Sequence, residues 1–441
     1  MTNSVPSSGS EADVAPLGNA STAERYADLP FLPNGGVVSA KGFKACGIHA
    51  GFRADPKRLD FALVAADQPA ACAAVFTTNV FCSAPVTVSK ERLGGVGYGT
   101  VRAVAINSGI ANAATGDKGL DTARQSSAIV ADALGCPAEE VLVASTGVIG
   151  QHLQMEPFET GSEKAVSALS SAGGHDAACA IMTTDTHPKE YAVSFSGSGI
   201  GYEGCSFTVG GMAKGSGMIM PNMATMISVI TTDAPIAAND LHTALKAAVD
   251  MSFNKITVDS DTSTNDSCFL LASGEAAKPG AAYMVPGTPA FSAFEHALRT
   301  VCIALARTMA TDGEGATRLI TVNVAGAKTV EDADAAARTV ANSPLVKTAI
   351  YGHDANWGRI AAALGRSGAA FDQESVGIDI MGLPVCRQGL TVPFDEEEAL
   401  RRFESPDVVI DINLGAGDEA TTMWTCDFSH EYVTINGDYR S

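Results

Sequence analysis

The segment from Lys214 to Ile230 constrains this chain most, because it joins a glycine-rich turn to an apolar strand through an Ala-Thr pair. The turn reads Lys-Gly-Ser-Gly-Met-Ile-Met-Pro-Asn-Met-Ala, and Thr225 follows it. If the peptide bond before Thr225 is cut, the new α-amine lies within reach of its own hydroxyl and can serve as its base. The segment therefore has the form of a self-cleaving junction. Most Ala-Thr pairs simply begin a strand, so the motif alone leaves an ordinary turn-to-strand connection open.

Length and charge limit the class of protein. A chain of 441 residues is long enough for two or three domains with large cores. The formal net charge of −20 would repel a phosphate backbone, so we expect no nucleic-acid partner. The longer apolar runs are interrupted well before the roughly 18 continuous residues that a bilayer span requires, so we expect no membrane association.

The residues that usually bind metals are scattered. The ten cysteines include no Cys-x-x-Cys pair, and the eight histidines include no His-x-x-x-His pair. Asp259, Asp261, Asn265 and Asp266 offer oxygen ligands, but their spacing misses the calcium-loop pattern. We expect reduced cysteines, no metal, and a polar loop near the active cleft over residues 260–267.

The first 30 residues are rich in Ser, Ala, Glu and Asp, with Arg25 as their only positive charge. They lack the apolar core of a secretory signal and the Arg-rich character of an organelle transit peptide. We therefore expect residues 1–30 to be a disordered leader on a cytoplasmic protein.

The rest of the chain alternates short β-rich runs with helical stretches, which predicts a mixed α and β fold. Residues 141–144 are predicted to form a strand that carries Ser-Thr-Gly at its C-terminal end. Residues 291–310 form the longest predicted helix, because their apolar positions follow one stripe. Residues 422–433 look strand-like, and the Tyr-Val-Thr-Ile run over 432–435 is predicted to be a strand that anchors the end of the chain.

Six segments in order resemble the ornithine acetyltransferase family, the transacetylases of the arginine pathway that mature by cutting before this threonine. They are residues 107–113, 145–150, 182–186, 214–226, 312–317 and 432–439. The resemblance runs from about Gly42 to Ser441. Two positions depart from the family pattern, since Ile110 stands where Asn is common and Ala114 where Cys is common. Neither lies at a position that we assign to chemistry.

The resemblance implies an N-terminal-nucleophile-like fold, a layered α/β/β/α sandwich with a smaller C-terminal α/β domain. Cleavage would give one chain of residues 1–224, folded over 31–224, and a second chain of residues 225–441. The smaller domain would begin near residue 290. The family also implies a heterotetramer with two copies of each chain.

The resemblance also assigns the site. Thr225 would be the nucleophile and Ala224 the residue that leaves. Thr146 and Gly147 match the family's oxyanion hole, where donors hold the negative oxygen of a tetrahedral intermediate. The substrate contacts carry over onto Thr183, Lys214, Thr225, Glu314, Asn436 and Ser441.

Local sequence alone favours plainer roles for several of these residues. Ser-Thr-Gly over 145–147 is also a common capping turn, and Thr183 would suit a turn or helix cap. Lys214 would usually be solvated, yet its surroundings are glycine and methionine, so it could meet a substrate carboxylate. Glu314, with glycine on both sides, suits a ligand ammonium or a flexible acidic loop.

The implied reaction moves acetyl from N2-acetylornithine to glutamate through an acetyl ester on Thr225, with small-molecule substrates and no organic cofactor or metal. Acetyl-CoA as a second donor stays open. One alternative is a hydrolase or aminopeptidase of the same fold, in which water takes the acyl group. Another is an uncut ligand-binding protein, and the presence of Thr225 argues against it.

Overall fold

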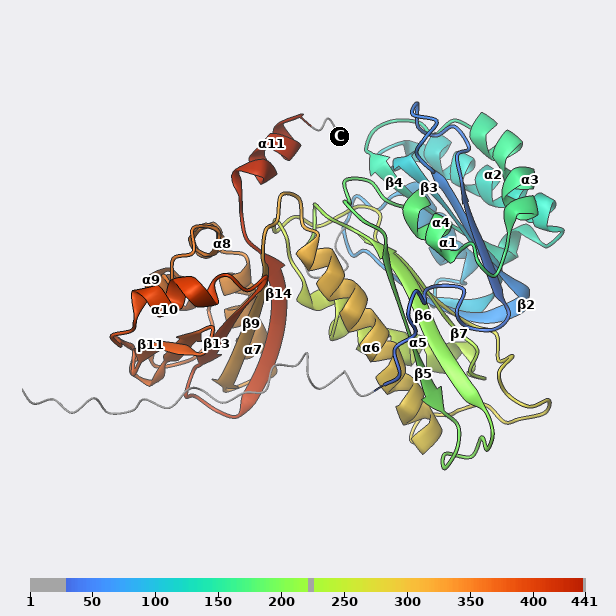
Figure 1. Ribbon diagram of the computed structural model, residues 1–441. Helices are drawn as coiled ribbons and strands as arrows, with labels where there is room; N and C mark the ends of the chain where they lie inside the picture. Colours follow the sequence, from blue (N-terminus) through green and yellow to red (C-terminus); the bar gives the residue numbers. More distant parts are fainter. Residues whose placement is uncertain (1–28, 221–225, 439–441) are drawn as a thin grey trace, which may run out of the picture. The chain divides into compact units, whose positions relative to one another are not determined.

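A computed structural model describes residues 29–220 and 226–438 (Figure 1). The expected leader therefore falls almost wholly outside the described residues. The described chain forms two compact units. The larger contains residues 29–319 and 424–438, and the smaller contains Ile320–Met423.

The larger unit is built on one mixed sheet with the strand order β4-β3-β2-β8-β7-β6-β5, in which β1 pairs with β2. Its strands are β1 Phe43–Ile48, β2 Phe61–Phe76, β3 Tyr98–Ile110, β4 Val141–Val148, β5 Lys189–Ser196, β6 Ser206–Lys214, β7 Ile227–Thr232 and β8 Ser267–Ala272. Its helices are α1 Ala84–Arg92, α2 Gly116–Leu134, α3 Glu156–Ala168, α4 Gly174–Ala180, α5 Ala238–Asp250, α6 Pro289–Thr311 and α11 His430–Asp438. Short 3-10 helices occupy Ala138–Glu140 and Phe253–Lys255.

The 16-residue strand β2 joins two parts of this sheet. Its first part pairs with β1 and its second with β8, and its register against β3 shifts between Ala65 and Ala70. Such an irregularity bends a strand and increases its twist. The bend lets one continuous sheet supply two stacked layers.

Side-chain alternation along β2 separates the layers. Phe61 and Leu63 pack in a cluster with residues of α2 and α3. Ala62 and Val64 point the other way, into a second cluster that includes Phe269 of β8. A third cluster lies between the opposite face of β7 and β8 and the helices α5 and α6. The order α2/α3, sheet, sheet, α5/α6 is the expected α/β/β/α sandwich, so this prediction is confirmed.

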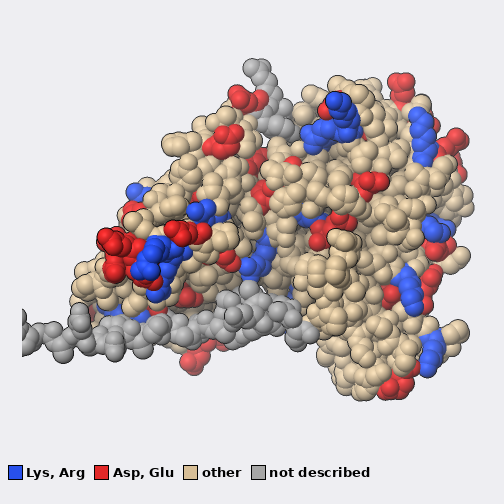
Figure 2. Space-filling view, in the orientation of Figure 1, with Lys and Arg blue, Asp and Glu red and all other residues tan. Residues whose placement is uncertain are grey.

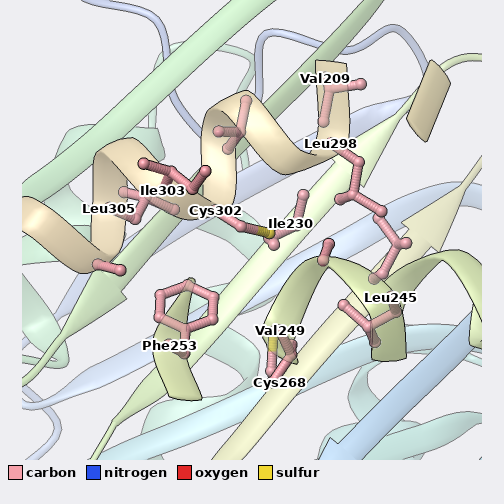
Figure 3. Packing of buried hydrophobic residues seen from close by; sticks show 14 of the residues in the cluster. Val209, Ile230, Leu245, Val249, Phe253, Cys268, Leu298, Cys302, Ile303 and Leu305 are labelled. Atoms are coloured by element: carbon pink, nitrogen blue, oxygen red, sulfur yellow. The ribbon is translucent and has the colours of Figure 1, made fainter. Parts of the chain in front are cut away.

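The helix predicted over residues 291–310 is α6, and it covers one outer face of the sandwich. Thr288 caps its first turn by accepting the Phe291 N–H at 3.3 Å, and Pro289 starts the helix. Figure 3 shows Leu298 and Cys302 of α6 gathered with Leu245 of α5 near Ile230 of β7. The helices therefore bury the strand that leaves the junction.

The smaller unit has a six-stranded sheet with the order β12-β11-β10-β13-β9-β14. Its strands are β9 Leu319–Ala327, β10 Gly377–Ile380, β11 Leu383–Arg387, β12 Leu390–Thr391, β13 Asp407–Asn413 and β14 Glu419–Cys426. Its helices are α7 Val330–Ala341, α8 Pro344–Tyr351, α9 Trp357–Gly365 and α10 Glu396–Arg402, with a 3-10 helix at Gln373–Ser375. The smaller unit begins at Ile320 rather than near residue 290, because α6 packs into the core of the larger unit.

The end of the chain differs from the sequence-based expectation. Strand β14 stops at Cys426, and residues 432–435 belong to helix α11, not to a strand. Ser429 lies between the two elements, where its hydroxyl accepts the Glu431 N–H at 3.1 Å and donates to the Gly315 carbonyl at 2.5 Å. The strand prediction was wrong because β-prone side chains do not decide the conformation of a short segment that is held by tertiary contacts.

Acidic and basic side chains lie interspersed on the face of the molecule shown in Figure 2.

Among the helices within residues 29–220 and 226–438, none has both the length and the hydropathy to span a bilayer. All ten cysteines are free thiols.

Candidate active site

Thr146 and Gly147 lie near the end of β4, where that strand runs parallel to β3. The prediction that a strand delivers Ser-Thr-Gly is confirmed, and β4 continues to Val148. Gly147 has φ +130°, and a Cβ there would lie 2.3 Å from the carbonyl carbon of Gly109 on β3. Only glycine fits this close approach. Thr146 is buried beside it, at 4% exposure.

Lys214 ends β6 and pairs with Ile227, the first residue of β7. The connection between these strands contains the junction, so both sides of the junction are fixed in one antiparallel pair. Ala224 and Thr225 themselves lie outside the described residues. Lys214 is only 2% exposed, in contrast to a typical solvated lysine. Burial lowers the pKa of the Lys214 ammonium, and the carboxylates nearby, Asp185 foremost, oppose this effect.

Asp185 is the centre of the buried charges around Lys214. Its Oδ1 accepts Lys189 Nζ and the Gly215 N–H, both at 2.7 Å, and its Oδ2 accepts the Thr183 N–H at 2.9 Å. Lys214 Nζ lies 4.0 Å from Oδ2. Burial alone would raise the pKa of Asp185, but Lys214 and Lys189 outweigh it and hold the pKa below its ordinary value. Asp185 is therefore an anion that orders Thr183 and the turn after Lys214.

A second buried carboxylate, Asp312, links this cluster to the part of the chain beyond the junction. Its Oδ2 accepts Lys189 Nζ at 2.5 Å and the Thr186 N–H at 3.0 Å. Its carbonyl accepts the Ser216 hydroxyl at 2.6 Å. Sequence reasoning did not identify Asp185, Lys189 or Asp312, although Asp185 and Asp312 lie within motifs that carried the resemblance.

Glu314 is positioned by the glycines around it. Its N–H donates to Ser216 O at 3.0 Å, and its Oε2 accepts the Asn436 side-chain amide of α11 at 2.8 Å. A Cβ on Gly217 would lie 2.4 Å from the Glu314 carboxyl carbon, and a Cβ on Gly315 would lie 2.5 Å from the Tyr432 backbone nitrogen. The flanking glycine therefore gives room for α11 rather than flexibility to an acidic loop.

One cavity of the larger unit brings the predicted residues together. It has a volume of about 120 Å³ and is lined by Thr146, Gly147, Thr183, Lys214, Glu314 and Asn436. The remaining predicted site residues, Ala224, Thr225 and Ser441, lie outside the described part of the chain. Gly217 and Met218, which lead into the junction, also line this cavity.

The polar loop expected near the cleft contributes Ser263, Thr264 and Asn265 to the same cavity. Asn265 donates through Nδ2 to Ala111 O at 2.7 Å and to Ser145 O at 2.8 Å, which ties the loop to the end of β4. Within residues 29–220 and 226–438, no group of three or more His, Cys, Asp or Glu side chains is placed to hold a metal ion. The cavity thus combines threonine hydroxyls with a lysine and a glutamate of opposite charge.

The family model described as the ArgJ family matches residues 44–441. The chain belongs to the ArgJ family. A relative named arginine biosynthesis bifunctional protein ArgJ, from Dehalococcoides mccartyi, is 46% identical over 413 residues, which cover 93% of this chain and 98% of that relative. Its counterpart from Symbiobacterium thermophilum is 48% identical over 408 residues, covering 92% and 99%.

Among solved structures, an ornithine acetyltransferase from Mycobacterium tuberculosis, crystallised with ornithine, is 39% identical with a TM-score of 0.39 and covers 43% of this ArgJ-family chain and 97% of its own. The family model spans residues 44–441, so the family assignment extends through both units of the fold.

Proposed function

We propose that this ArgJ-family chain cleaves itself between Ala224 and Thr225 and then transfers acetyl from N2-acetylornithine to glutamate through an ester on Thr225. The observation that carries the proposal is that six residues assigned by the resemblance, from Thr146 to Asn436, line one cavity. These residues are far apart in the sequence, and the fold brings them together in one small cavity, which supports a shared role.

The proposed cleavage begins when Thr225 Oγ attacks the Ala224 carbonyl carbon. The Oγ–C bond forms, the C–N bond breaks, and the hydroxyl proton passes to the departing nitrogen. Water then hydrolyses the ester, which leaves a carboxylate on Ala224 and a free hydroxyl and α-amine on Thr225. The Thr146 hydroxyl and the Gly147 N–H would donate to the oxyanion in this step.

Acetyl transfer would use the same groups. Thr225 Oγ attacks the acetyl carbonyl of N2-acetylornithine while its α-amine accepts the hydroxyl proton. The C–N bond then breaks, and ornithine leaves with that proton on its nitrogen. Glutamate's amine attacks the acetyl ester next, which releases N-acetylglutamate and restores the threonine hydroxyl.

Two opposite charges in the cavity suit amino-acid substrates. Lys214 offers an ammonium to a substrate carboxylate, and Glu314 offers a carboxylate to a substrate ammonium. Both side chains are more than nine-tenths buried, and charges act more strongly where water is excluded. Thr183 and Asn436 add hydrogen-bonding groups to the lining of the same cavity, and we assign Ser441 the same role.

We further propose that the two chains stay together as a heterotetramer of two copies of each, in the cytoplasm. Strands β7 and β8 follow the junction yet lie between β2 and β6, which precede it. Separating the chains would break strand pairing on both sides, which supports lasting association.

The direct test is to supply N2-acetylornithine with and without glutamate and to measure acetylglutamate, acetate and ornithine. The proposal predicts glutamate-dependent acetylglutamate with little acetate, whereas a hydrolase or aminopeptidase would release acetate regardless of glutamate. The Thr225→Ala variant should form neither acetylglutamate nor acetate. A parallel assay with acetyl-CoA and glutamate tests the second donor suggested by the word "bifunctional" in the relatives' names.

A further inference from the structure

Two carboxylates of one loop hold the backbone on both sides of the junction. Asp259 accepts the Met218 N–H through Oδ2 at 2.6 Å and the Ile219 N–H through Oδ1 at 2.8 Å. Asp266 accepts the Met226 N–H through Oδ1 at 2.9 Å. Met226 directly follows the proposed nucleophile, so only one peptide unit separates it from Thr225.

The backbone of the same segment adds further bonds. Ile219 O accepts the Val258 N–H at 2.7 Å and the Thr257 hydroxyl at 3.1 Å, and Ser267 N donates to Met226 O at 3.1 Å. Residues 257–267 thus bond to both flanks of the junction, and we call them the junction clamp. Met218 adopts φ +56°, which non-glycine residues rarely do without such surrounding contacts.

Asp266 is the unusual member of the clamp. Its side chain is fully buried, and this burial raises its pKa well above the ordinary value, although the Met226 N–H and the Ser263 side chain oppose the effect. A fully buried carboxyl group destabilises a fold unless another requirement keeps it there. The hydrogen bond to Met226 is the contact that connects Asp266 to the junction.

We propose that Asp266 is a positioning residue that fixes the Thr225 hydroxyl for attack by holding the Met226 N–H, while Asp259 holds the approach to the Ala224 carbonyl. The inference rests on the proposed function, because it concerns the same cleavage and the same ester. Attack requires the hydroxyl oxygen to lie about 3–3.5 Å from the carbonyl carbon, and a misplacement of about 1 Å can cost roughly 100-fold in rate.

The contacts of the two carboxylates differ once the bond is cut, although both belong to the chain that begins with Thr225. Asp259 remains bonded to the chain that ends at Ala224, whereas Asp266 remains bonded to the chain that begins with Thr225. Asp266 therefore acts in cleavage and in every later acetyl transfer, and Asp259 acts mainly in cleavage. A general loss of stability would not produce this difference between the Asp266 and Asp259 variants in cleavage and in acetyl transfer.

The experiment follows the full-length Asp266→Ala chain by denaturing mass measurement over time, and then measures kcat and KM on the processed fraction. We expect cleavage to slow by about 100-fold and kcat to fall, with little change in KM for either substrate. Asp266→Asn keeps an oxygen that can accept the Met226 N–H and should recover most of both rates. Asp259→Ala should slow cleavage but lower kcat less than Asp266→Ala does.

Asp132→Asn is the control, because Asp132 is an exposed carboxylate of α2 outside the junction clamp, and it should cleave at the wild-type rate. If the Asp266→Ala chain cleaves and turns over like the wild type, or only loses thermal stability, the role of Asp266 is wrong. The proposed function is not affected by that outcome. If that variant does not fold, Asp266→Ser repeats the test with a polar group too short to reach Met226. A wild-type chain that stays uncut and transfers no acetyl overturns the proposed function itself.

Discussion

At the scale of single residues, the cavity depends on Asp185, whose two oxygens hold two lysines and two backbone N–H groups. A buried ion pair adds little net stability when complete, but removing one partner leaves the other charge without compensation. Lys189 and Lys214 are both almost completely buried. The charge of Asp185 is thus more important for keeping these lysines inside the fold than for attracting a ligand directly.

Asp185→Asn should therefore lower the free energy of unfolding by about 3–5 kcal/mol at neutral pH, measured by urea denaturation. The folded state depresses the pKa of Asp185, so this contribution is present above the ordinary carboxyl pKa of about 3.9 and is lost as the pH falls below it. The difference in the free energy of unfolding between Asp185→Asn and the wild type should therefore become smaller at acid pH.

Asp67→Asn provides the control, because Asp67 pairs with Lys44 at 2.8 Å while both side chains are more than two-fifths exposed. Asp67→Asn should lower the free energy of unfolding by less than about 1 kcal/mol. An Asp185→Asn chain that is as stable as Asp67→Asn would contradict the role of Asp185.

Thr146→Ala should lower kcat of the processed enzyme by about 10²–10³ with little change in KM, because an oxyanion donor acts on the transition state. Thr321→Ala removes a buried threonine of the smaller unit and should leave kcat near the wild-type value. Steady-state kinetics on equal amounts of processed protein make the comparison. An unchanged kcat in Thr146→Ala would exclude Thr146 from the oxyanion hole.

The site residues that could be predicted from the sequence stand out in their local context, whereas the missed residues act through partners far away in the sequence. Lys214 and Glu314 stand out locally, since each is a charge among small or apolar residues. The role of Asp312 depends on a lysine 123 positions earlier in the chain. Such a pairing exists only after folding, so spacing within one sequence does not reveal it.

At the scale of elements, the hairpin β6–β7 and the helix α11 position the site. The hairpin fixes both sides of the junction through the Lys214 and Ile227 pair, and α11 brings Asn436 to Glu314. The apolar stripe predicted the helix α6, and a short β-rich run predicted the strand β4, because both signals are local. The sequence did not predict α11 or the start of the smaller unit at Ile320, because both depend on contacts with distant parts of the chain.

Deleting residues 437–441 tests the proposed role of Ser441 in substrate binding. Cleavage at Thr225 should remain, since the junction is held by β6, β7 and the junction clamp. KM for N2-acetylornithine and glutamate should rise, because the deletion removes the hydroxyl that we propose as a substrate contact. A truncated enzyme that keeps wild-type kcat/KM for both substrates would remove Ser441 from the site.

At the scale of the whole molecule, the sheet of the larger unit explains why a cut chain would remain one protein. The strands that follow the junction are inserted between strands that precede it, and the Lys189–Asp312 pair joins the two sides through a buried contact. Cleavage at residue 224 breaks none of these interactions.

We therefore expect the two fragments to co-elute as a single species in native gel filtration and to separate only in denaturant. The native mass should correspond to two copies of each fragment. Fragments that separate without denaturant would contradict the interleaved sheet as the source of association.

The central claim is that Thr225 is exposed by cleavage and then carries the acetyl group, and the mass of the denatured protein after incubation with N2-acetylornithine alone tests it most directly. The account predicts two chains, residues 1–224 and 225–441, with the second heavier by one acetyl group that disappears when glutamate is added. A single uncut chain, or a second chain that never gains the acetyl group, would contradict it.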